Sequence, residues 1–166
     1  QLQIEVPFFK KLVNKKLRNY INNFNSCWTP DNKKLNLSGK LSDTTLLKIN
    51  TEFIGLLSRF KKMEAELKYD YLFIVSGPQP ENDLFLKAIE DKILEVKSKI
   101  AIVSTTKSSQ PNSEVNYFYH PTTKALNQLF NESQCVISKS GYTTIMEMLS
   151  LHKKAILIPT KGQYEQ

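Results

Sequence analysis

The sequence predicts an α/β fold, in which a doubly wound parallel sheet is covered by helices on both faces. Two observations lead to this prediction. From Tyr69 onward, short apolar runs of strand length alternate with segments whose apolar residues recur at helical spacing. The apolar runs are continuous rather than alternating, which is typical of parallel strands buried on both sides. A composition of 40% hydrophobic and 23% charged residues is that of an ordinary globular domain.

The first part of the chain is organised differently. Residues 8–24 carry apolar side chains at helical spacing with Lys and Asn between them, which predicts an amphipathic helix. A short apolar piece, residues 26–28, ends in a turn cluster at residues 29–32. Residues 33–50 are polar and show no sustained period, so we expect a loop there. The predicted domains are residues 1–32, a linker at 33–50, and residues 51–166.

The second part holds the elements of the sheet. The predicted strands are residues 69–76, 100–104, 115–119, 135–138 and 155–159, and the predicted helices are residues 84–96, 122–130 and 143–151. The last residues have the composition of a loop, and no helix that would close the sheet follows them. The first residue is Gln rather than Met, and no signal peptide is visible. We therefore expect a domain that is truncated at both ends.

The net charge and the content of Cys and His indicate which partners and cofactors the protein can bind. The net charge is +7, with Lys and Arg concentrated near the start and around Arg59. A phospholipid surface or a phosphorylated substrate would suit this charge, and so would a merely solvated helix face. We expect no nucleic-acid partner. The two Cys are far apart, there are only two His, and no D-x-D pair occurs, so we expect neither a metal nor another cofactor.

Three loops of the predicted sheet are candidates for a binding site, because ligands of open parallel sheets bind beyond the carboxyl ends of the strands. The first holds Ser76 and Gly77, and could equally be a plain turn. The second holds a Gly among hydroxyl side chains directly before a helix, which favours an anion such as a diphosphate. The third is rich in amides and carboxylates that can bind sugar hydroxyls, although most polar loops are only solvated. The candidates in the second loop, called the Ser140 loop below, are Ser140, Gly141, Tyr142 and Thr143. Those in the third loop are Gln163, Glu165 and Gln166.

The position of Glu147 in the sequence allows two interpretations of its role. Thr144 and Glu147 match the capping-box pattern, in which the carboxylate returns a hydrogen bond to the start of its own helix. The alternative is a ligand-binding carboxylate next to the anion loop. The pattern favours capping slightly.

Three segments of the sequence resemble a known family. The run CVISKSGYTTIMEMLSLHKKAILIPTKGQYEQ, preceded by YLFIVSGPQPE and CWTPD, is similar to GT-B glycosyltransferases related to the peptidoglycan N-acetylglucosaminyltransferase of bacterial cell-envelope synthesis. The resemblance spans most of the chain and is most specific in the S-G-x-x-T-x-x-E element. It implies the Rossmann-like, donor-binding C-terminal lobe of a two-lobed GT-B fold. Residues 1–32 would be the end of the N-terminal acceptor lobe.

The resemblance also implies roles for individual residues. Ser76 and Gly77 would lie near the phosphates of a nucleotide sugar, the Ser140 loop would cradle its diphosphate, and Arg59 would be a further basic group there. Glu147 would bind the ribose hydroxyls, and this implication raises the ligand reading above capping. Glu165 and Gln166 would reach the donor sugar, with Gln163 beside them. The catalytic residues are unknown and are expected in the missing lobe, so the fragment alone should be inactive.

The function implied is a hexosyltransferase that moves a sugar from a UDP-linked donor to a lipid-linked or other glycan acceptor, by inverting displacement without metal. We expect a cytoplasmic protein with peripheral contact at the inner face of the membrane. Two alternatives stay open. One is a nucleotide-sugar epimerase or hydrolase on the same fold, and the other is a non-catalytic binding subunit that needs a partner chain.

Overall fold

The chain forms two compact units in the computed structural model, which describes residues 7–93 and 95–160. The described part of the first unit is residues 7–57, and the second unit is residues 58–160. The boundary therefore lies between Leu57 and Ser58, after the polar stretch that was expected to be the junction. The assignment of the first residues to an acceptor lobe stays a prediction.

The first unit combines a helix with a small parallel sheet. Helix α1 (Pro7–Ile21) precedes strand β1 (Ser26–Thr29), which pairs in parallel with β2 (Asn50–Phe53). A 3-10 helix, η1 (Gly39–Ser42), lies between the strands. The expected loop at residues 33–50 thus contains a short 3-10 helix and ends at the first residue of a strand that was not predicted. The sequence of β2, Asn-Thr-Glu-Phe, is too short and polar to show a strand period, and it becomes a strand because β1 pairs with it.

A buried carboxylate holds the connection between these strands. Asp31 is 0% exposed and accepts hydrogen bonds from the backbone N–H groups of Leu37 (3.1 Å) and Ser38 (3.0 Å). The hydroxyls of Ser38 and Ser42 also donate to it, at 2.6 and 2.9 Å. Burial alone would raise the pKa of Asp31, but these hydrogen bonds outweigh it and lower the pKa from 3.8 to about 2. The charged form of Asp31 therefore stabilises the first unit.

We expect this unit to lose about 2 kcal/mol of stability between pH 5 and pH 2 through Asp31 alone. The pKa is lower in the folded than in the unfolded state, so the stabilisation is present above 3.8 and is lost as the pH falls through about 2. Trp28, the single tryptophan, lies in β1, so its fluorescence during urea unfolding reports on this unit. The Asp31→Asn variant should show a shallower loss over the same range; an equal loss would show that other groups cause it.

The second unit contains the predicted parallel sheet. Its strands are β3 (Tyr69–Val75), β4 (Ile100–Ser104), β5 (Val115–Tyr119), β6 (Ser133–Lys139) and β7 (Lys154–Ile158). All neighbours pair in parallel, in the order β5-β4-β3-β6-β7. The chain builds outward from β3 to β5 and then crosses to β6 on the other side of β3. The point where the direction reverses, between β3 and β6, is where sheets of this kind bind ligands.

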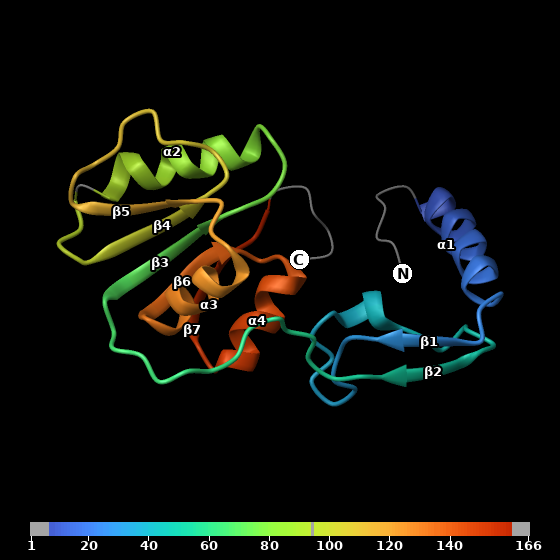
Figure 1. The fold of residues 1–166 in the computed structure, drawn as a ribbon. Helices are drawn as coiled ribbons and strands as arrows, with labels where there is room; N and C mark the ends of the chain where they lie inside the picture. Colours follow the sequence, from blue (N-terminus) through green and yellow to red (C-terminus); the bar gives the residue numbers. More distant parts are fainter. Residues whose placement is uncertain (1–6, 94, 161–166) are drawn as a thin grey trace. The chain divides into compact units, whose positions relative to one another are not determined.

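Helices cover both faces of this sheet, which confirms the predicted fold class. Helix α2 (Glu81–Ile93) lies on one face, and α3 (Thr123–Asn131) and α4 (Tyr142–Leu151) lie on the other (Figure 1). Leu72 and Ile74 of β3 belong to the core under α3 and α4, whereas Tyr71 and Phe73 pack with the core under α2. Among the described residues, no helix is long and apolar enough to cross a membrane.

Candidate functional site

A cavity of about 450 Å³ opens at the carboxyl edge of the sheet, on the face that α3 and α4 cover. This volume lies in the range of small-molecule sites. Four residues singled out from the sequence line it, and they come from three segments: Arg59, Ser76, Thr143 and Glu147. The other lining residues are Ile74, Val75, Val103, Ser104, Thr105, His120, Pro121, Leu126, Phe130 and Thr144.

Arg59 is positioned by the extended segment that leads into β3. Its neighbour Phe60 is buried in the core, with its ring 4.9 Å from that of Phe130. Two α3 side chains hold the backbone beyond it: Lys61 N–H donates to Asn127 Oδ1 at 3.1 Å, and Met63 N–H donates to Asn131 Oδ1 at 2.9 Å. The segment is thus fixed at its aromatic anchor and along its backbone, so Arg59 has a defined place at the cavity.

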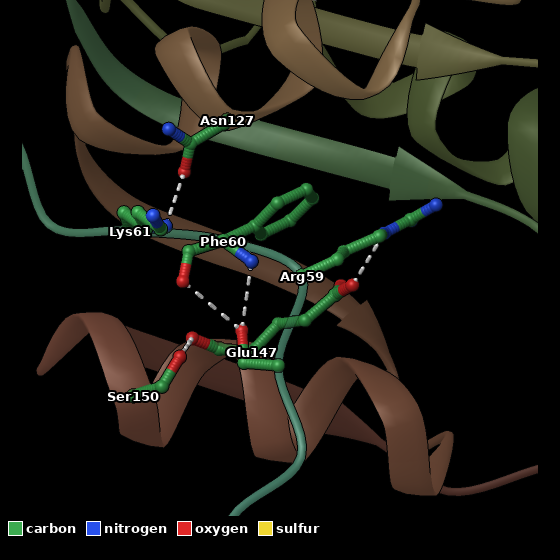
Figure 2. A network of polar contacts seen from close by, with 7 residues as sticks. Arg59, Phe60, Lys61, Asn127, Glu147 and Ser150 are labelled. Atoms are coloured by element: carbon green, nitrogen blue, oxygen red, sulfur yellow. Dashed lines mark hydrogen bonds and ion pairs between the residues drawn. The ribbon is translucent and has the colours of Figure 1, made fainter.

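Glu147 pairs with Arg59 across the cavity wall. Arg59 Nε donates to Glu147 Oε1 at 2.7 Å, although the two residues are 88 positions apart. The Glu147 side chain is 4% exposed and that of Arg59 is 53% exposed. Figure 2 shows the outer end of the guanidinium extending past the carboxylate. The pair therefore presents a buried acceptor and a half-exposed cation to the same cavity, which suits the hydroxyls and the phosphates of a nucleotide.

The capping reading of Glu147 is wrong, because the helix begins before the pattern does. Gly141 is the N-cap of α4, with φ −69° and ψ 136°, and it makes no side-chain capping bond. Thr144 is therefore already inside the first turn of the helix. Glu147 lies in the middle of α4, beyond the reach of its start, and its carboxylate is bound to Arg59 instead.

Of the candidate residues in the loop before α4 and at the start of this helix, only Thr143 lines the cavity. Ser140 turns toward the edge of the sheet, since its backbone N–H donates to Ile158 O at 3.1 Å and its hydroxyl does so at 3.4 Å. Gly141 and Tyr142 follow at the helix start, next to Thr143 at the cavity. Their contact with a diphosphate stays a prediction. Gln163, Glu165 and Gln166 lie outside the described residues.

Sequence reasoning missed two groups that follow the neighbouring strands. Thr105 follows β4, and its hydroxyl accepts a hydrogen bond from Asn82 Nδ2 at 2.9 Å. His120 follows β5 in a left-handed conformation, φ 47°, and its N–H donates to Ser104 O at 3.4 Å. Ligands of such sheets bind at the carboxyl ends of the strands, so both positions could have been predicted. Only three of the five loops that follow the strands were considered as candidate sites.

Lys139, the last residue of β6, is a third omission. Its Nζ is buried and lies 5.8 Å from the centroid of the Phe85 ring, on the α2 side of the sheet. A Cβ built on Gly77 would be 3.9 Å from this Nζ, so the ammonium lies against the loop after β3. The residue stands directly before the Ser140 loop in the sequence, but nothing in the sequence indicates that its charged end is buried.

Comparison with known proteins identifies the family of the chain. The model of the glycosyltransferase family 28 C-terminal domain matches residues 71–166, which is more than half of the chain. Neither the curated proteins nor the solved structures gave a significant match. The matched range includes most of β3, the loops after β3, β4 and β5, the Ser140 loop and α4, so it covers most of the residues that line the cavity. The chain therefore belongs to glycosyltransferase family 28 and carries the C-terminal, donor-binding domain of a GT-B glycosyltransferase.

Proposed function

We propose that the cavity beside Glu147 binds the nucleotide of a UDP-linked sugar, and that the protein transfers a hexose from it. The observation that carries this proposal is the Arg59–Glu147 pair in a cavity at the carboxyl edge of a family 28 donor-binding domain. The proposal places the ribose hydroxyls on the Glu147 carboxylate. It places the phosphates toward Ser76 and Gly77 at the switch point between β3 and β6.

The chemistry that fits these residues is displacement without metal at the anomeric carbon. The leaving diphosphate needs positive charge and hydrogen-bond donors, and the start of α4 and the half-exposed Arg59 supply both. We propose inversion at the anomeric carbon, as in the peptidoglycan N-acetylglucosaminyltransferase-like family, and a lipid-linked glycan as acceptor. The base that deprotonates the acceptor would come from the other lobe.

A nucleotide-sugar epimerase or hydrolase would need a free acid or base inside the cavity. Two ionisable side chains besides Arg59 line it. Glu147 is engaged by Arg59, and His120 is exposed to solvent rather than enclosed in the cavity. This pattern favours donor binding followed by transfer over either alternative.

The experiment is a binding and transfer panel on the full-length protein. Calorimetry with uridine, guanosine and thymidine diphosphates should show a preference for the uridine nucleotide. Transfer from the matching UDP-hexoses to lipid-linked acceptors should follow, with inversion visible in the product's anomeric NMR signal. Absence of binding by every nucleotide diphosphate would overturn the proposal. Release of free sugar at the same rate with and without acceptor would favour a hydrolase.

A further inference from the structure

We propose that Lys139 binds the distal phosphate of the donor and thereby makes the site select nucleoside diphosphates over monophosphates. This inference rests on the proposed function, since it names the group that would recognise the diphosphate of that donor. It goes beyond the Arg59–Glu147 cavity, because Lys139 lies on the other face of the sheet, against Phe85 of α2.

Lys139 Nζ is buried and has no hydrogen-bond partner among the residues that the structure describes. An ammonium carries three N–H donors, and leaving them buried and unpaired is unfavourable. The Phe85 ring, 5.8 Å away, offers only a weak cation–π contact.

A half-buried lysine of the same unit, Lys153, shows how such a group is normally satisfied. Lys153 Nζ donates to the backbone carbonyls of Asn131 at 3.0 Å and Ser133 at 2.6 Å. Lys153 thus ties α3 to the start of β6 as a structural residue. Lys139 has no comparable carbonyl contacts in the described chain, so its N–H donors remain available to an anion.

Lys139 ends β6, and Gly77 follows β3, and these are the two strands that flank the switch point of the sheet. The ammonium lies against Gly77, with 3.9 Å between Nζ and the position of a Cβ there. The phosphates of a nucleotide whose ribose is on Glu147 would cross this edge, so the phosphate farther from the ribose meets Lys139.

The test compares the Lys139→Met variant with the unchanged full-length protein by calorimetry. The variant should bind uridine diphosphate about 10- to 100-fold more weakly, which is the effect of one lost charge-assisted hydrogen bond. Its affinity for uridine monophosphate should change by less than about threefold. Inorganic pyrophosphate, which needs no base or ribose site, should bind the unchanged protein and lose affinity in the variant.

Thermal unfolding separates a binding role from a structural one. Lys139→Met should melt at the same temperature or higher, because it removes an unpaired buried charge. The control Lys153→Met should melt lower, because it breaks two hydrogen bonds, and should keep the preference for the diphosphate. A lower melting temperature for Lys139→Met, with an unchanged ratio of di- to monophosphate affinity, would overturn the proposal.

The two proposals fail in different ways. If no uridine nucleotide binds but pyrophosphate binding depends on Lys139, the assignment of a uridine donor is wrong. The assignment of Lys139 as a phosphate-binding residue is then still supported. If both uridine nucleotides bind and Lys139→Met weakens neither, the donor site stands and Lys139 is not part of it.

Discussion

Replacing Glu147 by glutamine should weaken the binding of uridine diphosphate by about 10- to 100-fold. In the proposed site the ribose hydroxyls donate to a carboxylate that is only 4% exposed, so the hydrogen bonds are charge-assisted and shielded from water. The amide keeps the shape of the side chain but lacks the charge. Uridine and uridine monophosphate should lose affinity by a similar factor, because both contain the ribose. Isothermal calorimetry measures all three.

The same substitution should cost little stability, on the order of 1 kcal/mol. Breaking a fully buried ion pair costs more, but the Arg59 side chain is 53% exposed, so water replaces the lost carboxylate. The amide oxygen can also still accept from Arg59 Nε. Thermal unfolding of both proteins checks this expectation.

The Lys68–Glu132 ion pair provides a matched control. Its atoms are 2.6 Å apart and its side chains are 51% and 9% exposed, close to the values for Arg59 and Glu147. Lys68 precedes β3 and Glu132 precedes β6, so this pair lies at the amino edge of the sheet, away from the cavity. Glu132→Gln should lower stability comparably and leave nucleotide affinity unchanged. Equal effects of the two variants on affinity would refute a ligand role for Glu147.

The sheet was predictable because its strands are short apolar runs that can be buried only between two layers. The element limits differ by a few residues, as at α2, which begins at Glu81 rather than Leu84. The strand at Asn50–Phe53 escaped prediction because pairing, not its own composition, makes it a strand. Local pattern therefore determines the second unit more fully than the first.

The sequence predicts which loops form the site, but it does not predict which side chains contact one another there. The rule that ligands bind at the carboxyl ends of strands located Ser76 and Thr143, which line one cavity. The contact between Arg59 and Glu147 joins residues that are 88 positions apart, and only the folded sheet brings them together. Lys139 Nζ lies near Phe85 and Gly77, which come from α2 and from the loop after β3. Such tertiary contacts leave no periodic signal in a single sequence.

Replacing Gly77 by alanine should lower the free energy of unfolding by about 1–3 kcal/mol and weaken uridine diphosphate binding by about tenfold or more. Gly77 has φ +125°, a conformation that residues with a Cβ rarely adopt. Space is not the obstacle, since the nearest atom to an added Cβ would be Lys139 Nζ at the ordinary distance of 3.9 Å. The cost is therefore backbone strain, and the loop relieves it by moving Ser76 away from the cavity that it lines.

Gly55→Ala is the control that separates strain from binding. Gly55 has φ +80° with open space around an added Cβ, so alanine causes strain of the same kind there. It lies in the first unit, whose unfolding Trp28 fluorescence follows. Gly55→Ala should therefore shift the Trp28 transition and leave nucleotide affinity unchanged, whereas Gly77→Ala should reduce affinity with little change in that transition. If Gly77→Ala destabilised the second unit but bound uridine diphosphate normally, the loop after β3 would be a turn and not part of the phosphate site.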